Sequence, residues 1–80
     1  MPVRALVEAG ADVNAARTDN GCTPVYAAAQ NGHLEVVREL LGIGADANTA
    51  RTDNGATPVF IASNNGHLQV VRELLSRGAD

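Results

Sequence analysis

The sequence predicts a mainly α-helical solenoid of stacked helix-turn-helix units joined by β-hairpin-like loops. The main observation is an internal repeat: segment 23–44 is written again, with few changes, 34 positions later at 57–78. A fixed period between about 20 and 50 residues indicates a solenoid rather than one globular core. Each copy also holds two short apolar stretches with helical spacing, and helices under about 12 residues are marginal in water unless they pack on a neighbour.

Composition excludes several classes of function. The chain has 80 residues, 45% of them hydrophobic and 2% aromatic, so its core must consist of Ala, Val and Leu. The net charge is -3 and the basic residues are scattered among acidic ones, so we expect no nucleic-acid partner. No membrane-spanning run and no signal-peptide pattern are visible, so we expect a soluble chain without a membrane partner. The single cysteine, Cys22, favours an intracellular, cytoplasmic location.

We expect a single domain that consists of the tail of one truncated repeat followed by two further repeats. In the truncated part, Val3, Leu6 and Val7 have the spacing of one helical stripe, and Gly10 is placed to end that helix. The boundaries are 1–13, 14–47 and 48–80, within a domain over 1–80.

A loop and a short helix open each repeat. Residues 11–22 are mostly small or polar, and Asn20 with the glycine after it favours the positive φ values of a tight hairpin turn. Thr23 is a suitable N-cap, and Pro24 suits the first helical position, where its missing N–H has no helical partner. The Asn-Gly pair at 31–32 is predicted to end this helix after about two turns.

A second helix is predicted from about residue 33 or 34 to residue 41, with Gly44 ending it. Its apolar residues recur at helical spacing and should face the core, whereas its charged residues should face solvent. The predicted core stripe is Leu34, Val37, Leu40 and Leu41, and the predicted solvent face is Glu35, Arg38 and Glu39.

Several sequence blocks, repeated in the same order, resemble the ankyrin repeat over the whole chain: Gly-x-Thr-Pro-Val, Ala-Ala or Ala-Ser, Asn-Gly-His-Leu, Val-Val-x-x-Leu-Leu and Gly-Ala-Asp. The histidine that the family usually has after Thr-Pro is replaced by Tyr26 and Phe60, so an aromatic ring should pack where a polar contact is lost. The period also exceeds the family's usual value of about 33. The hairpin tip should therefore project further than usual.

The resemblance implies a non-catalytic protein-protein interaction module without a cofactor, whose hairpin tips and first helices present a concave face to a protein or peptide partner. Two other readings stay open: a structural, self-assembling repeat fragment, and the regulatory domain of a larger protein. By position, the resemblance implies contacts at Asp19, Asn20, Cys22, Gln30 and Asn31, and at Asp53, Asn54, Ala56, Asn64 and Asn65. The inserted length adds Arg17 and Arg51. Ordinary solvated loop chemistry is the alternative for any single one of them.

Metal binding and catalysis find little support in the sequence. A zinc site needs three or four converging ligands, but each repeat offers one histidine, His33 or His67, without a nearby cysteine or second histidine. Cys22 and Thr23 are the only candidate nucleophiles, and the second repeat has Ala56 in place of the cysteine. We therefore expect neither a metal nor an enzyme.

The chain is expected to self-associate end to end. Terminal repeats of solenoids normally carry polar residues on the outer face. Here the last repeat keeps the apolar residues that the preceding repeat should use to pack on its neighbour. We therefore expect head-to-tail contact between copies of the chain, with a symmetric dimer as the alternative. This set is Leu68, Val70, Val71, Leu74 and Leu75, equivalent to Leu34, Val36, Val37, Leu40 and Leu41.

Overall fold

The computed structural model describes residues 18–79, and this part of the chain contains α-helices and no strand. The mainly α-helical class is therefore confirmed. The expectations for Val3, Leu6, Val7, Gly10 and Arg17 lie outside the described residues. The helices are α2 (Pro24–Gln30), α3 (Leu34–Gly42), α4 (Pro58–Asn64) and α5 (Leu68–Ser76).

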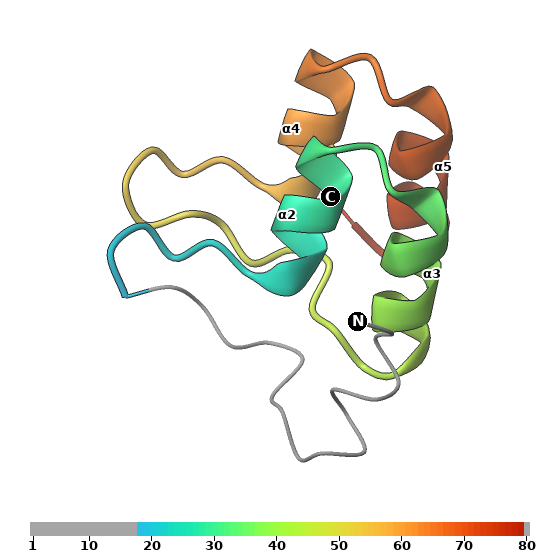
Figure 1. The fold of residues 1–80 in the computed structure, drawn as a ribbon, viewed down its shortest axis with the longest axis horizontal. Coiled ribbons are helices and arrows are strands. Elements are labelled where there is room, and N and C mark those ends of the chain that lie inside the picture. Colours follow the sequence, from blue (N-terminus) through green and yellow to red (C-terminus); the bar gives the residue numbers. More distant parts are fainter. Residues whose placement is uncertain (1–17, 80) are drawn as a thin grey trace.

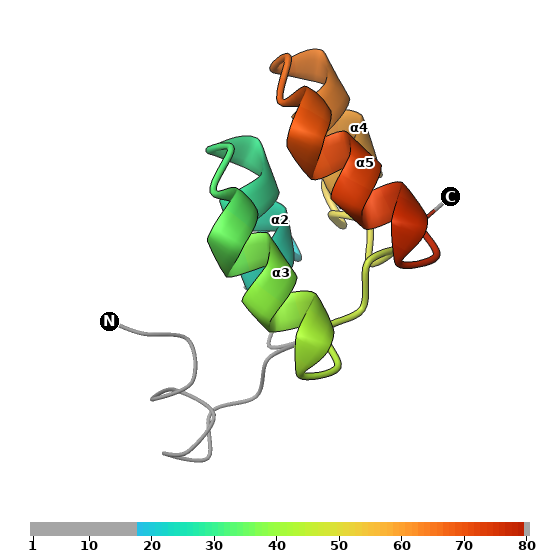
Figure 2. The ribbon, with the colours of Figure 1, turned by 90° about the vertical axis from the view of Figure 1, so that its right-hand side faces the viewer.

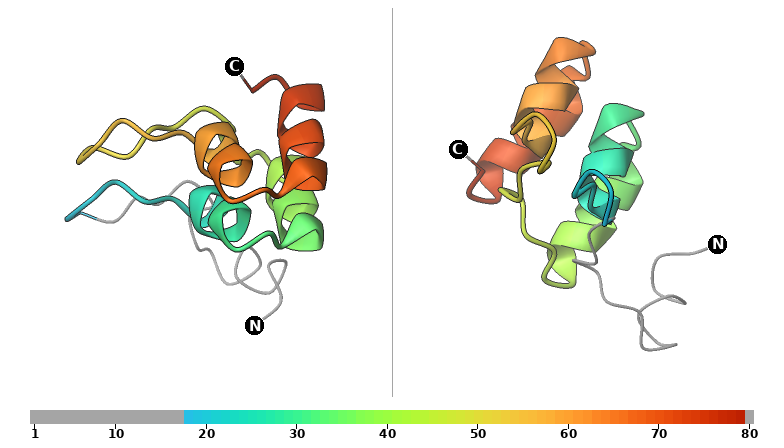
Figure 3. Two further views of the ribbon diagram at one scale, coloured as in Figure 1. Left: turned by 90° about the horizontal axis from the view of Figure 1, so that it is seen from above. Right: turned by 90° about the vertical axis from the view of Figure 1, so that its left-hand side faces the viewer.

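The four helices form two stacked pairs (Figure 1). Within a pair, α2 packs on α3 and α4 packs on α5; between pairs, α2 packs on α4 and α3 packs on α5. The pairs α2–α3 and α4–α5 repeat the same arrangement side by side (Figure 2). The loops that precede α2 and α4 project away from the helices, on the side opposite α3 and α5 (Figure 3). The fold thus has an inner layer, α2 and α4, an outer layer, α3 and α5, and two projecting loops.

The helices of the inner layer begin at the predicted capping residues. The Thr23 hydroxyl accepts a hydrogen bond from the backbone N–H of Tyr26 at 3.3 Å, and the Thr57 hydroxyl accepts one from Phe60 at 3.2 Å. A proline follows each threonine at the start of the helix. Each cap satisfies one of the backbone donors that a helix leaves unpaired in its first turn.

Each of the four helices ends in a Schellman motif built on a glycine with positive φ. After α2, Gly32 has a φ of +70°, and the N–H of His33 donates to the Ala28 carbonyl at 2.9 Å. After α3, the N–H of Ala45 donates to the Leu40 carbonyl at 2.9 Å, across Gly44. The predicted ends at residues 32 and 44 are confirmed, and α3 extends one residue past Leu41.

The core lies between the layers and continues from one repeat into the next. Val37 and Leu40 of α3 are buried, as are Val70 and Leu74 of α5, and small alanines fill the space around α2 and α4. Leu34 and Leu41 are partly buried against this core, so the predicted stripe is confirmed. On the predicted solvent side, Glu35 and Arg38 are exposed but Glu39 is half-buried. Full burial of a Leu or Val contributes about 1.5 to 3 kcal/mol.

The tight Asn-Gly turn expected in the loops does not form. In segment 51–56, the N–H of Arg51 donates to the Ala56 carbonyl at 2.8 Å, and the N–H of Gly55 donates to the Arg51 carbonyl at 3.0 Å. The loop is hairpin-like, but only its glycine has a positive φ, whereas a two-residue type I′ turn needs two such residues. The asparagine instead acts through its side chain, because Oδ1 of Asn54 accepts a hydrogen bond from the backbone N–H of Ala56 at 2.9 Å.

Candidate partner-binding surface

The asparagines predicted at the loop tips hold the loops themselves. Asn20 accepts a hydrogen bond from the backbone N–H of Cys22 at 2.9 Å, as Asn54 does from Ala56 in the next repeat. Short side chains that bond the backbone two residues ahead stabilise turns locally. The side-chain oxygen of each asparagine therefore forms its hydrogen bond within its own loop. The predicted contact residue Ala56 is buried, with only 8% of its surface exposed.

The side chain of Arg51 also forms contacts within the protein. Its guanidinium pairs with the Asp53 carboxylate and lies over the ring of Tyr26, 5.5 Å from the ring centroid. The hydrogen bond from Arg51 holds the pKa of Asp53 below its usual range, and the same bond raises the pKa of Arg51. Because Tyr26 belongs to the preceding repeat, this cation-π contact ties one loop to the neighbouring helix α2.

Three polar contacts connect the repeats on the side of the inner layer. The backbone N–H of Thr52 donates to the Asn20 carbonyl at 2.9 Å and links the two loop tips. At the other end of α2, the Gln30 carbonyl accepts from Asn65 Nδ2 at 3.0 Å and lies 3.1 Å from His67 Nε2, which must carry the proton to donate to it. His67 therefore links the start of α5 to the end of helix α2 in the preceding repeat.

The remaining predicted partner residues differ in exposure. Cys22 is half-buried, with its Sγ 3.7 Å from the Thr23 carbonyl. Asn31 and Asn65 are exposed, but the side chain of the first donates to its own helix, at the Ala27 carbonyl. Gln30 and Asn64 end the two inner helices. The exposed set consists of Asp19, Gln30, Asn31, Asp53, Asn54, Asn64 and Asn65.

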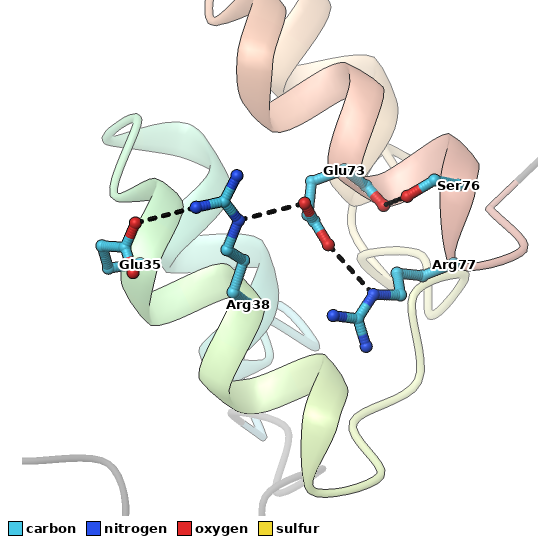
Figure 4. A network of polar contacts seen from close by, with 5 residues as sticks. All are labelled: Glu35, Arg38, Glu73, Ser76 and Arg77. Atoms are coloured by element: carbon cyan, nitrogen blue, oxygen red, sulfur yellow. Dashed lines mark hydrogen bonds and ion pairs between the residues drawn. The ribbon is translucent and has the colours of Figure 1, made fainter.

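An ion-pair network joins the repeats across the outer layer (Figure 4). Arg38 on α3 contacts Glu35 through Nη1 at 2.9 Å and reaches Glu73 on α5 through Nε at 3.1 Å. Arg77 adds a second contact to Glu73, at 2.9 Å. The hydrogen bond from Arg38, followed by that from Arg77, holds the pKa of Glu73 below its usual range, although partial burial opposes the shift.

The prediction that both aromatic rings pack is confirmed for Tyr26 and is wrong for Phe60. Phe60 is 59% exposed, whereas its equivalent Tyr26 is 2% exposed beneath the loop of the next repeat. The ring borders an open cavity of ≈ 400 Å³. The 34-residue alignment could have indicated this exposure. Phe60 is equivalent to Tyr26, and Tyr26 is the residue that the next repeat covers. The cavity is lined by Asn54, Gly55, Ala56, Thr57 and Phe60.

The apolar set expected to be open in the last repeat needs a correction. Val70 and Leu74 are buried in the core, because their side of α5 packs on the preceding repeat. Leu68 and Leu75 are exposed, at 59% and 52%, and Val71 is half-buried. One helix has two packing sides, and only one of them points away from the preceding repeat.

Residues 18–79 contain no group of three or more His, Cys, Asp or Glu side chains that could hold a metal ion. Within the same part of the chain, no helix has the length and apolar character needed to cross a membrane.

Comparison with known proteins agrees with this architecture. A search of curated proteins finds no significant match to the chain. The family model described as ankyrin repeats (3 copies) matches residues 2–80, which is nearly the whole chain. The helix pairs, the projecting loops and the 34-residue spacing occur within that match. The chain therefore belongs to the ankyrin repeat family.

Proposed function

We propose that the chain is a non-catalytic protein-interaction module, which binds a protein or peptide through its inner surface. The inner surface is the exposed part of the projecting loops and of α2 and α4. Ankyrin repeats generally bind protein partners. The observation that carries the proposal is that the loops and the inner helices lie on one side of the molecule and bear exposed polar side chains.

The hydrogen bonds of the loops support this choice of surface. Asn20 and Asn54 brace their own loops, Arg51 anchors one loop on Tyr26, and the bond between Thr52 and Asn20 joins the two tips. A surface that is already ordered loses little conformational entropy when a partner binds, so more of the contact energy appears as affinity. These residues are proposed to shape the surface, and the exposed Asp19, Gln30, Asp53 and Asn64 are proposed to contact the partner.

The experiment selects ligands from a random-peptide display library and measures their affinity for variants of the full chain. The inner variant carries Asp19→Ala, Gln30→Ala and Asn64→Ala, three exposed positions whose side chains lie outside the core. The control carries Glu35→Ala and Gln69→Ala, which change exposed positions of the outer layer. We expect the selected peptides to lose at least about tenfold in affinity for the inner variant, or about 1.4 kcal/mol.

Retained affinity for the inner variant, together with loss for the control, would place partner binding on the outer layer. Loss for both variants would point to unfolding, which circular dichroism detects independently. The library must yield peptides that bind the unchanged chain, and a failure to select any would count against a peptide-binding role. The self-assembling alternative is favoured by a different observation, the exposed side chain of Phe60.

A further inference from the structure

Four asparagines of the chain are followed directly by a glycine, at 20–21, 31–32, 54–55 and 65–66. Such a pair has a chemistry of its own. Glycine has no Cβ, so its backbone nitrogen can approach the side-chain carbonyl carbon of the asparagine before it and displace the amide nitrogen. The reaction needs the side chain to bend over the following peptide. The structure therefore decides which of the four pairs can react in the folded protein.

Asn31 and Asn65, at the ends of α2 and α4, are held away from this geometry. Their ψ angles are 3° and 5°. A ψ near zero places the residue's own backbone nitrogen in line with the glycine nitrogen, whereas a five-membered ring needs Cβ there. Each amide nitrogen also donates a hydrogen bond at 3.0 Å, to the carbonyl of Ala27 or of Gln30. Ring closure at either asparagine must therefore break the end of a helix.

Asn54, in the loop before α4, has its side chain bent in the required direction. Its Oδ1 accepts from the backbone N–H of Ala56 at 2.9 Å, which folds the side chain back along the peptide of Gly55. The same N–H faces the oxygen on which negative charge develops when a nucleophile attacks Cγ, and a backbone donor in that position stabilises such a charge. Nδ2, the leaving group, has no hydrogen bond to another residue within 18–79.

Asn20 has the same kind of side-chain bond, from the N–H of Cys22, but its peptide is held by the neighbouring repeat. The Asn20 carbonyl accepts from the N–H of Thr52 at 2.9 Å, and a Cβ on Gly21 would lie 2.8 Å from that nitrogen. Ring closure at Asn20 therefore has to separate the loops of two repeats. We expect this pair to react slowly although its side chain is well placed.

Ring closure at Asn54 has to open one hydrogen bond, which lies inside its own loop. The N–H of Gly55 donates to the Arg51 carbonyl at 3.0 Å. A loop with few buried contacts opens locally at a smaller cost in free energy than a helix terminus that packs on a neighbour. A repeat or a partner that packed on this loop would raise that cost, as the second repeat does for the loop of the first.

We propose that Asn54 is a site of spontaneous covalent modification, which converts its amide into a carboxylate. The backbone nitrogen of Gly55 gives up its proton and bonds to Cγ of Asn54. The bond from Cγ to Nδ2 breaks, and Nδ2 leaves with that proton as ammonia, so that a succinimide ring closes. Water then adds to one of the two ring carbonyls and opens the ring, as aspartate or as isoaspartate. One water is consumed, one ammonia is released, and nothing is oxidised or reduced.

The product changes the loop tip in two ways. It adds a negative charge next to Asp53, which pairs with Arg51. Isoaspartate in addition lengthens the main chain by one carbon, so the acceptor for the N–H of Ala56 is displaced. The proposed inner surface includes this loop, but the reaction needs no partner, so either proposal can fail without the other.

The test is peptide mapping of the full chain by mass spectrometry after incubation in mildly alkaline buffer. Trypsin releases peptides 18–38 and 52–72, each of which contains one loop pair and one helix-end pair. Fragment ions then compare two sites within one peptide. We expect Asn54 to convert first, to both acids, and Asn31 and Asn65 to convert at least about tenfold more slowly. The rate should rise with pH, because the glycine nitrogen must lose its proton.

Two controls separate the effect of the fold from that of the local sequence. In urea, the four pairs should react at similar rates, because each keeps its Asn-Gly sequence and loses its structure. In Asn54→Gln, closure would need a six-membered ring, so this position of peptide 52–72 should stay unmodified. Circular dichroism establishes that the variant is folded.

Three outcomes would overturn the proposal. If the four pairs react in urea but Asn54 does not react in the folded chain, its loop protects it as well as the helix ends protect theirs. Equal rates at Asn54 and Asn65 in the folded chain would show that the side-chain bonds do not select the site. Formation of aspartate without isoaspartate would show direct hydrolysis by water instead of ring closure.

Discussion

Gly21 and Gly55 occupy the same position in the two repeats and have the same backbone conformation, with φ of +72° and +71°. Their surroundings differ. Gly21 lies against the backbone of Thr52, whereas Gly55 has open space beside its Cα. At position 21, both the left-handed backbone and the close approach of Thr52 require glycine. At position 55, only the left-handed backbone requires it.

We therefore expect Gly21→Ala to destabilise the fold more than Gly55→Ala. Both variants carry the roughly 1 to 2 kcal/mol of a left-handed alanine. Gly21→Ala in addition forces apart the two loops and lengthens the 2.9 Å bond between Thr52 and Asn20. Urea unfolding at low protein concentration measures the difference. Equal losses for the two variants would mean that the loop contact contributes nothing to stability.

At the scale of the element, the helices have seven or nine residues and depend on their caps and on their neighbours. Helices of this length do not persist alone in water. Thr57 starts α4 by accepting from Phe60, and Leu40 anchors α3 in the core. One residue thus acts on the helix terminus and the other on packing, and the two contributions can be measured separately.

Thr57→Ala should lower the free energy of unfolding by about 1 kcal/mol, because α4 loses its cap. Thr57→Ser retains the hydroxyl oxygen and should recover most of the loss. Thermal unfolding followed by circular dichroism compares the three chains. The cap would be irrelevant if serine and alanine behaved alike.

Leu40→Ala should lower the free energy of unfolding by about 2 to 5 kcal/mol, because it leaves a cavity at a buried position. Leu75→Ala removes the same atoms from a side chain that is 52% exposed and should have a much smaller effect when the protein is dilute. A melting curve unchanged by Leu40→Ala would contradict the observed core.

At the scale of the whole molecule, hydrogen bonds and an ion pair in three places, together with the contact of Arg51 with Tyr26, couple the two repeats within residues 18–79. The loop tips are joined by the bond from Thr52 to Asn20, the helix ends by the Gln30 carbonyl, and the outer helices by the pair of Arg38 and Glu73. The apolar core runs between these polar contacts. Stability in such an array is approximately a sum of repeat terms and interface terms, so a change at the interface should be felt by both repeats.

The pair of Arg38 and Glu73 should make stability depend on pH in the acid range. The folded-state pKa of Glu73 lies below its usual value, chiefly because Arg38 donates to the carboxylate. The stabilisation is therefore present above the unfolded-state pKa of about 4.3 and is lost as pH falls through the lower, folded-state pKa. We expect Glu73→Gln to weaken the fall of the melting temperature between neutral and acid pH.

Glu35→Gln is the control for this experiment, because Glu35 contacts the same arginine but remains well exposed. Melting temperatures of the three chains, measured at a series of pH values and at low salt, make the comparison. If Glu73→Gln left the pH profile unchanged, the contact across the repeats would have no share in acid stability.

Much of the fold was predictable because its determinants lie within a few residues of one another in the chain. Thr-Pro starts the inner helices, glycines end the helices, and the spacing of Val37 and Leu40 marks the core side of α3. The 34-residue period predicted the stacking of equivalent units. The exposure of the predicted surface residues was less predictable. Arg51 is half-buried and lies over Tyr26 of the neighbouring repeat, and Ala56 is buried.

The sequence by itself determined the helices, their termini and the family, because hydrogen-bonding groups and apolar spacing act locally. Only the tertiary structure decided which of two equivalent residues is buried. Tyr26 and Phe60 have nearly the same local sequence, yet one lies beneath Arg51 and the other is open. Asn31 bonds its own helix whereas Asn65 bonds the neighbouring repeat. The physical reason is that a residue's surroundings depend on whether another repeat packs on its side of the stack, which a short stretch of sequence does not encode.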